Sequence, residues 1–173
     1  MAKRTRARLR ALNLGGPMHN LADMISEDRI VDLKAETKEA ALRELVSLMA
    51  TSKCVLEKEA LLRAILEREK TLSTGVGIGV AVPHAMIPEV TDFVIAIGRS
   101  HRGIEFDALD EKPVLIIVMI AASDKHSRGE YLKVLARLMQ KLRNKEFRRK
   151  VMFAKSPREI LNAFLAKQSE ETQ

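Results

Sequence analysis

The chain has few of the residues that build several common kinds of functional site. Among its 173 residues there are one cysteine, one tyrosine and no tryptophan, and aromatic side chains make up 3%. A single cysteine, Cys54, forms no internal disulfide and builds no thiolate metal site alone, so we interpret it as a core residue of a cytoplasmic protein. The scarcity of aromatic rings argues against nucleic-acid modules that stack bases, so no nucleic acid is expected as a partner.

Long apolar runs are also missing. No stretch approaches the length that spans a membrane, and no apolar segment of a signal peptide follows the basic N-terminus. The sequence therefore predicts no membrane insertion. Hydrophobic residues nevertheless make up 46% of the chain, which is typical of a globular protein whose core is built from Leu, Ile, Val, Ala and Met. A chain of this length predicts one domain with a sizeable core.

Positive charge is unevenly distributed. The formal net charge is +7, and residues 3–10 contain five Lys and Arg residues and no acid. This segment is either a basic arm for nucleic acid or an acidic partner, or a solvated leader, and its lack of aromatics favours the leader. Because Gly15-Gly16-Pro17 breaks the chain, residues 1–17 are expected to be a flexible basic tail and residues 18–173 a folded domain.

Apolar runs and amphipathic patterns alternate irregularly from residue 21 onward. Short β-like runs cover 29–33 and 93–97, and the most apolar run, 114–121, predicts a central strand. Helical patterns cover 38–51, 57–68, 127–142, 144–153 and 157–167, the fourth with a basic face. Thr37 is a predicted N-cap, and Ser127 with Glu130 forms a predicted capping box. The fold class predicted is α/β, a single-domain sandwich in which helices flank a mixed β-sheet.

The most distinctive stretch spans residues 68–85 and reads R-E-K-T-L-S-T-G-V-G-I-G-V-A-V-P-H-A. It passes through three glycines at alternate positions and becomes a β-like run over 80–82. Glycines permit tight turns and close backbone approach, and Pro83 interrupts the run. His84 is therefore expected where a strand stops, beside a small-residue loop and before an apolar loop over 85–88.

Two residues of this stretch have both a functional and a purely structural interpretation. His84 is a nucleophile near neutral pH if its ring nitrogen is neutral and accessible, or else a structural histidine at a strand end. Arg68 is expected at the C-terminal end of helix 57–68, where the helix dipole favours a cation in any case. Its position at the head of the glycine loop favours a functional role.

The same stretch resembles the phosphorylation-site signature of enzyme IIA domains of the fructose/mannitol class, which belong to the phosphoenolpyruvate-dependent sugar phosphotransferase system. The nitrogen-regulatory branch of this class fits best. A second similar segment is 103–114, which reads G-I-E-F-D-A-L-D-E-K-P-V. The resemblance covers roughly residues 20–167, and the Pro83-His84 pair in its glycine context is more specific than a lone glycine motif.

The resemblance implies a chemistry and its partners. A histidine phosphocarrier protein would dock and pass a phosphoryl group to His84, which would hand it to a IIB domain or use it as a signal to a regulatory target. Arg68 would stabilise the phosphate with its planar charged fork, and Ser73, Thr74 and Gly75 would bind phosphate. No metal and no cofactor is implied.

One position departs from the pattern of the resembling class. Members usually have a second histidine at the start of the helix after the central strand, and the matching residue here is Tyr131. The helix is expected to bury Leu132, Leu135 and Leu138 and to leave Tyr131 at its first exposed turn. The other histidines, at positions 19, 101 and 126, are expected at the surface.

Two hypotheses of different class remain. The first is a phosphocarrier or regulatory IIA protein that accepts a phosphoryl group on His84. The second is a non-catalytic regulatory binding protein that kept the fold, with weak or no phosphotransfer. The intact segment from Arg68 to His84 favours the first, whereas Tyr131 favours the second.

Overall fold

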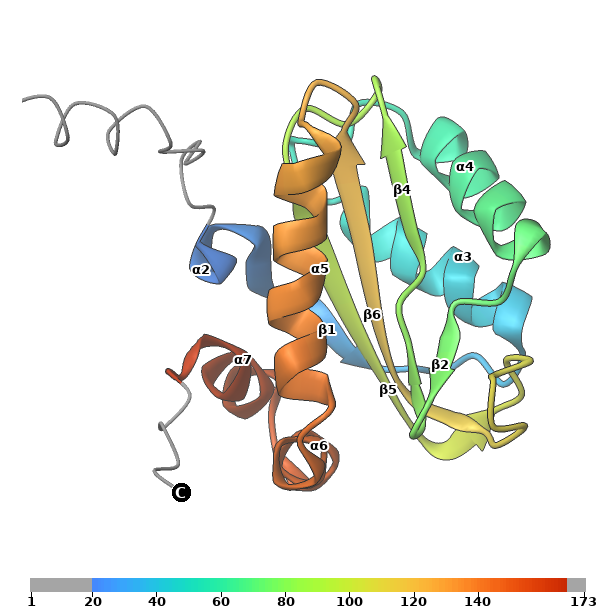
Figure 1. Cartoon of the computed structure of the whole chain (residues 1–173), viewed down its shortest axis with the longest axis vertical. Helices are drawn as coiled ribbons and strands as arrows, with labels where there is room; N and C mark the ends of the chain where they lie inside the picture. The colour runs from blue at the N-terminus through green and yellow to red at the C-terminus, as the bar shows by residue number, and fades with distance from the viewer. Residues whose placement is uncertain (1–19, 168–173) are drawn as a thin grey trace, which may run out of the picture.

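A computed structural model describes residues 20–167 as one mixed β-sheet with helices on both faces (Figure 1). The predicted tail, residues 1–17, and His19 lie outside the described residues, so the boundary between tail and domain stays a prediction. Among the described residues, no helix is both long and apolar enough to cross a membrane.

The sheet has six strands: β1 (Ile25–Asp32), β2 (Gly75–Gly77), β3 (Val80–Ala81), β4 (His84–Ile87), β5 (Val94–Ile104) and β6 (Val114–Ser123). Their order is β1-β5-β6-β3-β2, and β4 also pairs with β6. The pairs β1–β5, β3–β6 and β4–β6 are parallel, whereas β5–β6 and β2–β3 are antiparallel. The central strand is β6, as its apolar sequence predicts.

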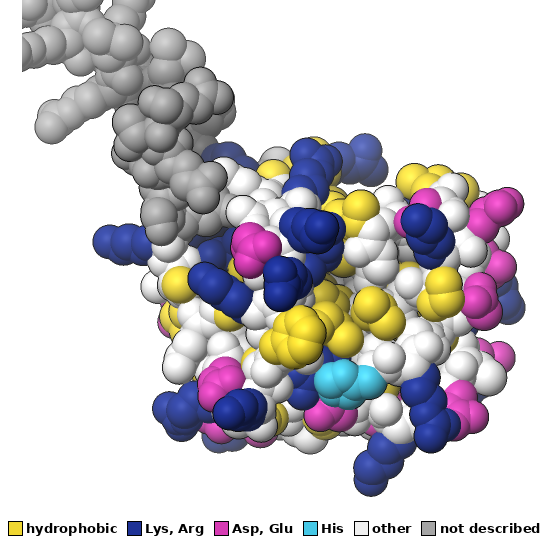
Figure 2. Space-filling model, turned by 90° about the horizontal axis from the view of Figure 1, so that it is seen from below, with side chains coloured by type: hydrophobic (Ala, Val, Ile, Leu, Met, Phe, Trp, Pro, Cys, Tyr) yellow, Lys and Arg dark blue, Asp and Glu magenta, His cyan; other side chains and the backbone are white. Residues whose placement is uncertain are grey.

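The helices are α2 (Leu21–Met24), α3 (Lys38–Met49), α4 (Lys58–Thr71), α5 (Arg128–Leu142), α6 (Lys145–Phe153) and α7 (Pro157–Leu165). Two of them begin at the caps predicted above. Thr37 accepts a hydrogen bond from the backbone N–H of Ala40 at the start of α3, and Ser127 and Glu130 form a complete capping box at the start of α5. Figure 2 views the end of the molecule where α6 lies, and Lys and Arg side chains are frequent on it.

Each face of the sheet buries its own apolar core. Side chains point to opposite faces at alternate positions along a strand, so Ile117 and Met119 of β6 pack with α3 and α4, whereas Ile116 and Val118 pack with α2, α5, α6 and α7. Cys54 packs against the first of these cores. The predicted fold class is therefore confirmed.

The structure corrects the expected end of the strand at His84. β3 ends at Ala81, but pairing with β6 resumes at His84, which lies opposite Ile120, and continues through the segment expected to be an apolar loop. Pro83 breaks the strand without ending it, because proline lacks an N–H but keeps its carbonyl, which accepts a hydrogen bond from Ile120. His84 therefore opens a strand and is anchored against the centre of the sheet.

Candidate functional site

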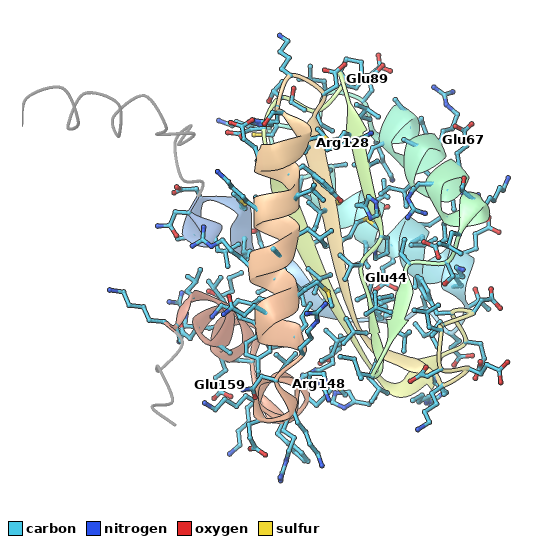
Figure 3. All side chains as sticks on the ribbon, viewed as in Figure 1. Glu44, Glu67, Glu89, Arg128, Arg148 and Glu159 are labelled. Atoms are coloured by element: carbon cyan, nitrogen blue, oxygen red, sulfur yellow. The ribbon has the colours of Figure 1, made fainter. Side chains whose placement is uncertain are left out.

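An open hollow brings α4, β4 and the first turns of α5 together around His84. Figure 3 marks Glu67 on α4 and Arg128 on α5, which lie on either side of β4. The hollow is lined by Ala64, Glu67, Arg68, Thr71, His84, Ala85, Met86, Ile87, Arg128, Tyr131 and Leu132. Three of the residues singled out from the sequence, Arg68, His84 and Tyr131, thus meet in one place.

The two ring nitrogens of His84 have different partners. Nδ1 lies 3.0 Å from the carbonyl oxygen of Val82, and Nε2 lies 3.2 Å from Nε of Arg68. A carbonyl only accepts and a guanidinium only donates, so Nδ1 carries the proton and Nε2 carries the lone pair. The backbone of the same short segment therefore selects the tautomer in which Nε2 is the nucleophilic nitrogen.

The surroundings of His84 favour its neutral form. Burial lowers the pKa of His84 below its usual 6.5, and the nearby Arg68 charge lowers it further, while the Val82 carbonyl and Glu69 oppose this. Because protonation at Nε2 removes the nucleophile, a lowered pKa keeps the lone pair available at more acidic pH.

If His84 accepts a phosphoryl group, as the resemblance implies, acceptance should persist into mildly acidic solution. As pH falls, the acid limb of the acceptance rate should lie below pH 6.5, the ordinary pKa of histidine, because the pKa of His84 is lowered. An NMR titration of the His84 imidazole gives the pKa directly, and a short histidine-containing peptide titrated under the same conditions serves as the reference. A midpoint for His84 at or above that of an unperturbed histidine would contradict the expectation.

Arg68 is held by two contacts at the end of α4. Its Nη1 donates to the carbonyl oxygen of Leu72 at 2.9 Å, while its Nε donates to His84. The first contact satisfies a carbonyl at the helix end and is compatible with the structural interpretation of Arg68 as a helix-end cation. The second goes beyond that role, since it brings the guanidinium to the lone pair of His84 Nε2.

The three residues expected to bind phosphate are engaged within the protein. The Ser73 hydroxyl donates to the carbonyl of Phe106 at 2.7 Å, and the Gly75 N–H donates to the Ser73 hydroxyl oxygen at 3.1 Å. The Thr74 hydroxyl donates to the Glu69 carboxylate at 2.6 Å. Unlike Arg68 and Tyr131, none of the three is among the residues that line the His84 hollow. Their role as phosphate ligands stays a prediction.

Tyr131 faces the site and not the solvent. It is 6% exposed, whereas Leu132 is 52% exposed, so the expected burial of Leu132 is wrong. The core-facing row of α5 is instead the one that starts at Tyr131 and continues through Val134 and Leu138. The rings of Tyr131 and His84 are tilted, with their centroids 5.6 Å apart.

The hydroxyl of Tyr131 is buried and has no hydrogen-bond partner. Burial raises the pKa of Tyr131 well above its usual 10, against a smaller opposing effect of Arg68, so the phenol stays protonated at physiological pH. A buried unpaired donor is costly and needs an explanation. The site therefore contains a neutral donor beside His84 that the folded protein itself leaves unused.

The other described histidines lie away from this hollow. His101 is exposed on β5 and lies 3.5 Å from Asp32. His126 is more enclosed than expected, because its ring stacks on Phe93 and its nitrogens contact Asp92 and Glu130. Within residues 20–167, no group of three or more His, Cys, Asp or Glu side chains is placed to hold a metal ion.

Sequence reasoning did not single out Glu69 or the Val82 carbonyl. Glu69 follows Arg68 directly and is buried, with its carboxylate bound to Thr74. An acidic residue at the end of a helix opposes the helix dipole, and that local conflict is the signal that could have marked Glu69. No side-chain pattern marks a backbone carbonyl.

Comparison with known proteins gives a consistent family. Residues 24–167 match the family model described as phosphoenolpyruvate-dependent sugar phosphotransferase system, EIIA 2. The chain is 36% identical over 124 residues to the fructose-specific EIIA component of Haloferax volcanii, and this alignment covers 72% of this chain and 80% of that protein. It is 33% identical over 132 residues to the fructose-specific EIIABC component of Bacillus subtilis, covering 76% of this chain but 21% of that much longer protein.

The fold agrees with a solved structure of the same kind. The crystal structure of nitrogen regulatory protein IIA-Ntr from Neisseria meningitidis superposes with a TM-score of 0.77 at 30% sequence identity, and the match covers 84% of this chain and 99% of that one. The resemblance found in residues 68–85 is thereby confirmed. The chain belongs to the EIIA type-2 family of the phosphoenolpyruvate-dependent sugar phosphotransferase system.

Proposed function

We propose that this chain is a phosphocarrier or regulatory IIA protein that accepts a phosphoryl group on Nε2 of His84. The observation that carries the proposal is the pair of opposed contacts on the His84 ring, with Nδ1–H held by the Val82 carbonyl and Nε2 facing Arg68. The donor we infer is a histidine phosphocarrier protein. The receiver is a IIB domain or a regulatory target protein, and the exchange takes place in the cytoplasm.

In the proposed transfer, the phosphorus–nitrogen bond of the carrier breaks as a bond forms between phosphorus and Nε2 of His84. The Nε2 lone pair supplies the electrons, and the carrier's ring nitrogen takes the pair of the broken bond. No proton leaves His84 in this step, because Nδ1 keeps its proton and continues to donate it to the Val82 carbonyl oxygen. This hydrogen bond stabilises the positive charge that the ring gains.

Arg68 has a role in both states of the site. In the unphosphorylated protein its Nε–H donates a hydrogen bond to the lone pair of His84 Nε2. This hydrogen bond must break before that lone pair can attack phosphorus. The guanidinium is then beside the transferring group, where a planar cation binds phosphoryl oxygens well. Phosphoryl transfer depends mainly on such positioning and charge stabilisation.

The test is a reconstituted transfer reaction. The protein is incubated with phosphoenolpyruvate, enzyme I and the histidine phosphocarrier protein, and its intact mass is measured. We expect one phosphoryl group that is labile in acid and stable in base, as a phosphorus–nitrogen bond requires. Binding of the carrier without uptake would instead support a non-catalytic regulator.

For Tyr131 we propose that the hydroxyl donates to a phosphoryl oxygen of phosphorylated His84. The unpaired donor lies on a ring that neighbours the His84 ring, so the phosphorylated state offers the partner that the free state lacks. A neutral donor of this kind contributes less than the cation that a histidine provides when protonated.

Two substitutions at Tyr131 should therefore have opposite effects. Tyr131→Phe should shorten the half-life of phosphohistidine about 2- to 10-fold, since it removes one net hydrogen bond, and should leave folding unharmed because the buried hydroxyl is unpaired. Tyr131→His should raise the transfer rate or the half-life, most strongly toward pH 6. Both are measured between pH 6 and 8, and identical curves for all three proteins would show that the hydroxyl does not reach the phosphoryl group.

A further inference from the structure

Glu69 is the centre of a buried polar network behind the His84 site. It is 7% exposed, although carboxylates are rarely buried unless paired. One carboxylate oxygen accepts from the Thr74 backbone N–H at 2.9 Å, and the other accepts from the Thr74 hydroxyl at 2.6 Å. The Lys38 ammonium lies 2.9 Å from the first oxygen and neutralises the charge. Every described polar contact of this carboxylate is thus made within the protein.

This network closes a short turn on which Arg68 depends. The Glu69–Thr74 contacts join the last turn of α4 to the segment after it, and Leu72 lies inside the loop that they close. The Leu72 carbonyl is the acceptor for Nη1 of Arg68. The direction of that carbonyl, and with it the direction of the guanidinium, follows from the closed turn.

The same threonine also reaches His84 through the backbone. The Thr74 carbonyl accepts from the Val82 N–H at 3.0 Å, and the Val82 carbonyl accepts from Nδ1 of His84 at 3.0 Å. A continuous chain of hydrogen bonds therefore runs from the Glu69 carboxylate through Thr74 and Val82 to the imidazole. Arg68 and His84 are both fixed relative to the same residue.

We propose that Glu69, acting through Thr74, is a positioning residue that sets the contact between Arg68 and the reactive nitrogen of His84. Lys38 forms an ion pair with the buried carboxylate, and the backbone N–H and hydroxyl of Thr74 each donate to one of its oxygens. The hydroxyl of Thr74 thereby holds the turn. The consequence for phosphoryl transfer rests on the function proposed above, whereas the effect on Arg68 does not.

The first experiment compares three variants in the transfer assay. Glu69→Gln keeps the volume but loses one acceptor and the charge, and Thr74→Val removes the hydroxyl donor. We expect each to lower the maximal transfer rate about tenfold, the effect of one charge-assisted hydrogen bond. The KM for the phosphocarrier should stay unchanged, because Glu69 is buried. Glu59→Gln, an exposed carboxylate in the first turn of the same helix, is the matched control and should behave as the parent protein.

A double-mutant cycle separates positioning from general damage. If Glu69 acts through Arg68, then Glu69→Gln should have a much smaller effect in an Arg68→Ala background than in the parent. The same tenfold loss in both backgrounds would overturn the proposal. So would a loss that appears only as a raised KM.

A second readout does not need phosphoryl transfer at all. The Arg68 Nε–H is bound to His84 Nε2, so its hydrogen exchange should be slow in the parent protein and several-fold faster in Glu69→Gln and Thr74→Val. Backbone amides of β6 should exchange unchanged, which rules out global loosening. Unchanged exchange of the Arg68 Nε–H in both variants would refute the positioning role, whether or not His84 is phosphorylated. If exchange is faster in the variants but the parent protein takes up no phosphoryl group, only the proposed function is refuted.

Discussion

A His84→Ala variant is expected to take up no phosphoryl group under conditions in which the parent protein is fully phosphorylated. The substitution removes Nε2, which is the nitrogen left with a lone pair by the contact between Nδ1 and the Val82 carbonyl. No other described histidine lines the hollow, so none replaces it within residues 20–167. The intact mass before and after incubation with phosphoenolpyruvate, enzyme I and the phosphocarrier gives the answer directly.

The control for this variant is another histidine of the same chain. His101→Ala changes an exposed imidazole that contacts Asp32 and should leave uptake intact. His101 lies on β5, six residues beyond Ile95, which pairs with the β6 residue opposite His84. The pKa of Asp32 is lowered mainly by Arg99, so that carboxylate keeps its principal partner. Uptake by His84→Ala would place the acceptor elsewhere and would contradict the proposed function.

The meeting of Arg68 and His84 was predictable from the sequence, because both belong to one recognisable segment. The helix pattern places Arg68 at a helix end, and the glycines with Pro83 require the chain to turn back within a few residues. The side-chain partners of Ser73 and Thr74 were not predictable in the same way. Hydroxyls beside glycines suit a phosphate equally well, and only the folded turn shows that the Thr74 hydroxyl is bound to Glu69.

The strand at His84 and the direction of Tyr131 depend on long-range packing. Pro83 has the local pattern of a strand end, and the pairing of residues 84–87 with β6 comes from residues more than thirty positions later. On α5, apolar residues are so frequent that two adjacent rows fit a buried face. The sheet and α6 select the row of Tyr131, Val134, Leu138 and Leu142. Helical periodicity alone does not distinguish the two rows.

Replacing Arg68 with alanine should slow phosphoryl transfer to His84 by roughly 10²- to 10³-fold, the usual effect of removing one preorganised donor from a site where charge develops. The fold should change little, since what is lost structurally is two local hydrogen bonds, one to the Leu72 carbonyl at the end of α4 and one to Nε2 of His84. Arg68→Lys keeps the charge but not the planar fork, so its rate should lie between those of the parent and Arg68→Ala. Single-turnover transfer rates and melting temperatures of the three proteins provide the comparison.

The same variants reveal whether Arg68 acts on His84 or serves only as a favourable positive charge in the last turn of α4. The Arg68 charge contributes to lowering the pKa of His84, after burial, so its removal should raise the pKa of His84 toward its ordinary value while burial still holds it down. A helix-end charge with no contact to the ring would leave that titration unchanged. If Arg68→Ala has the melting temperature, transfer rate and His84 pKa of the parent protein, Arg68 is only a helix-end cation and has no role at the His84 site. A slowed transfer together with a raised pKa would show that the guanidinium, in addition to burial, lowers the pKa of His84 and also stabilises the phosphoryl group that Nε2 receives.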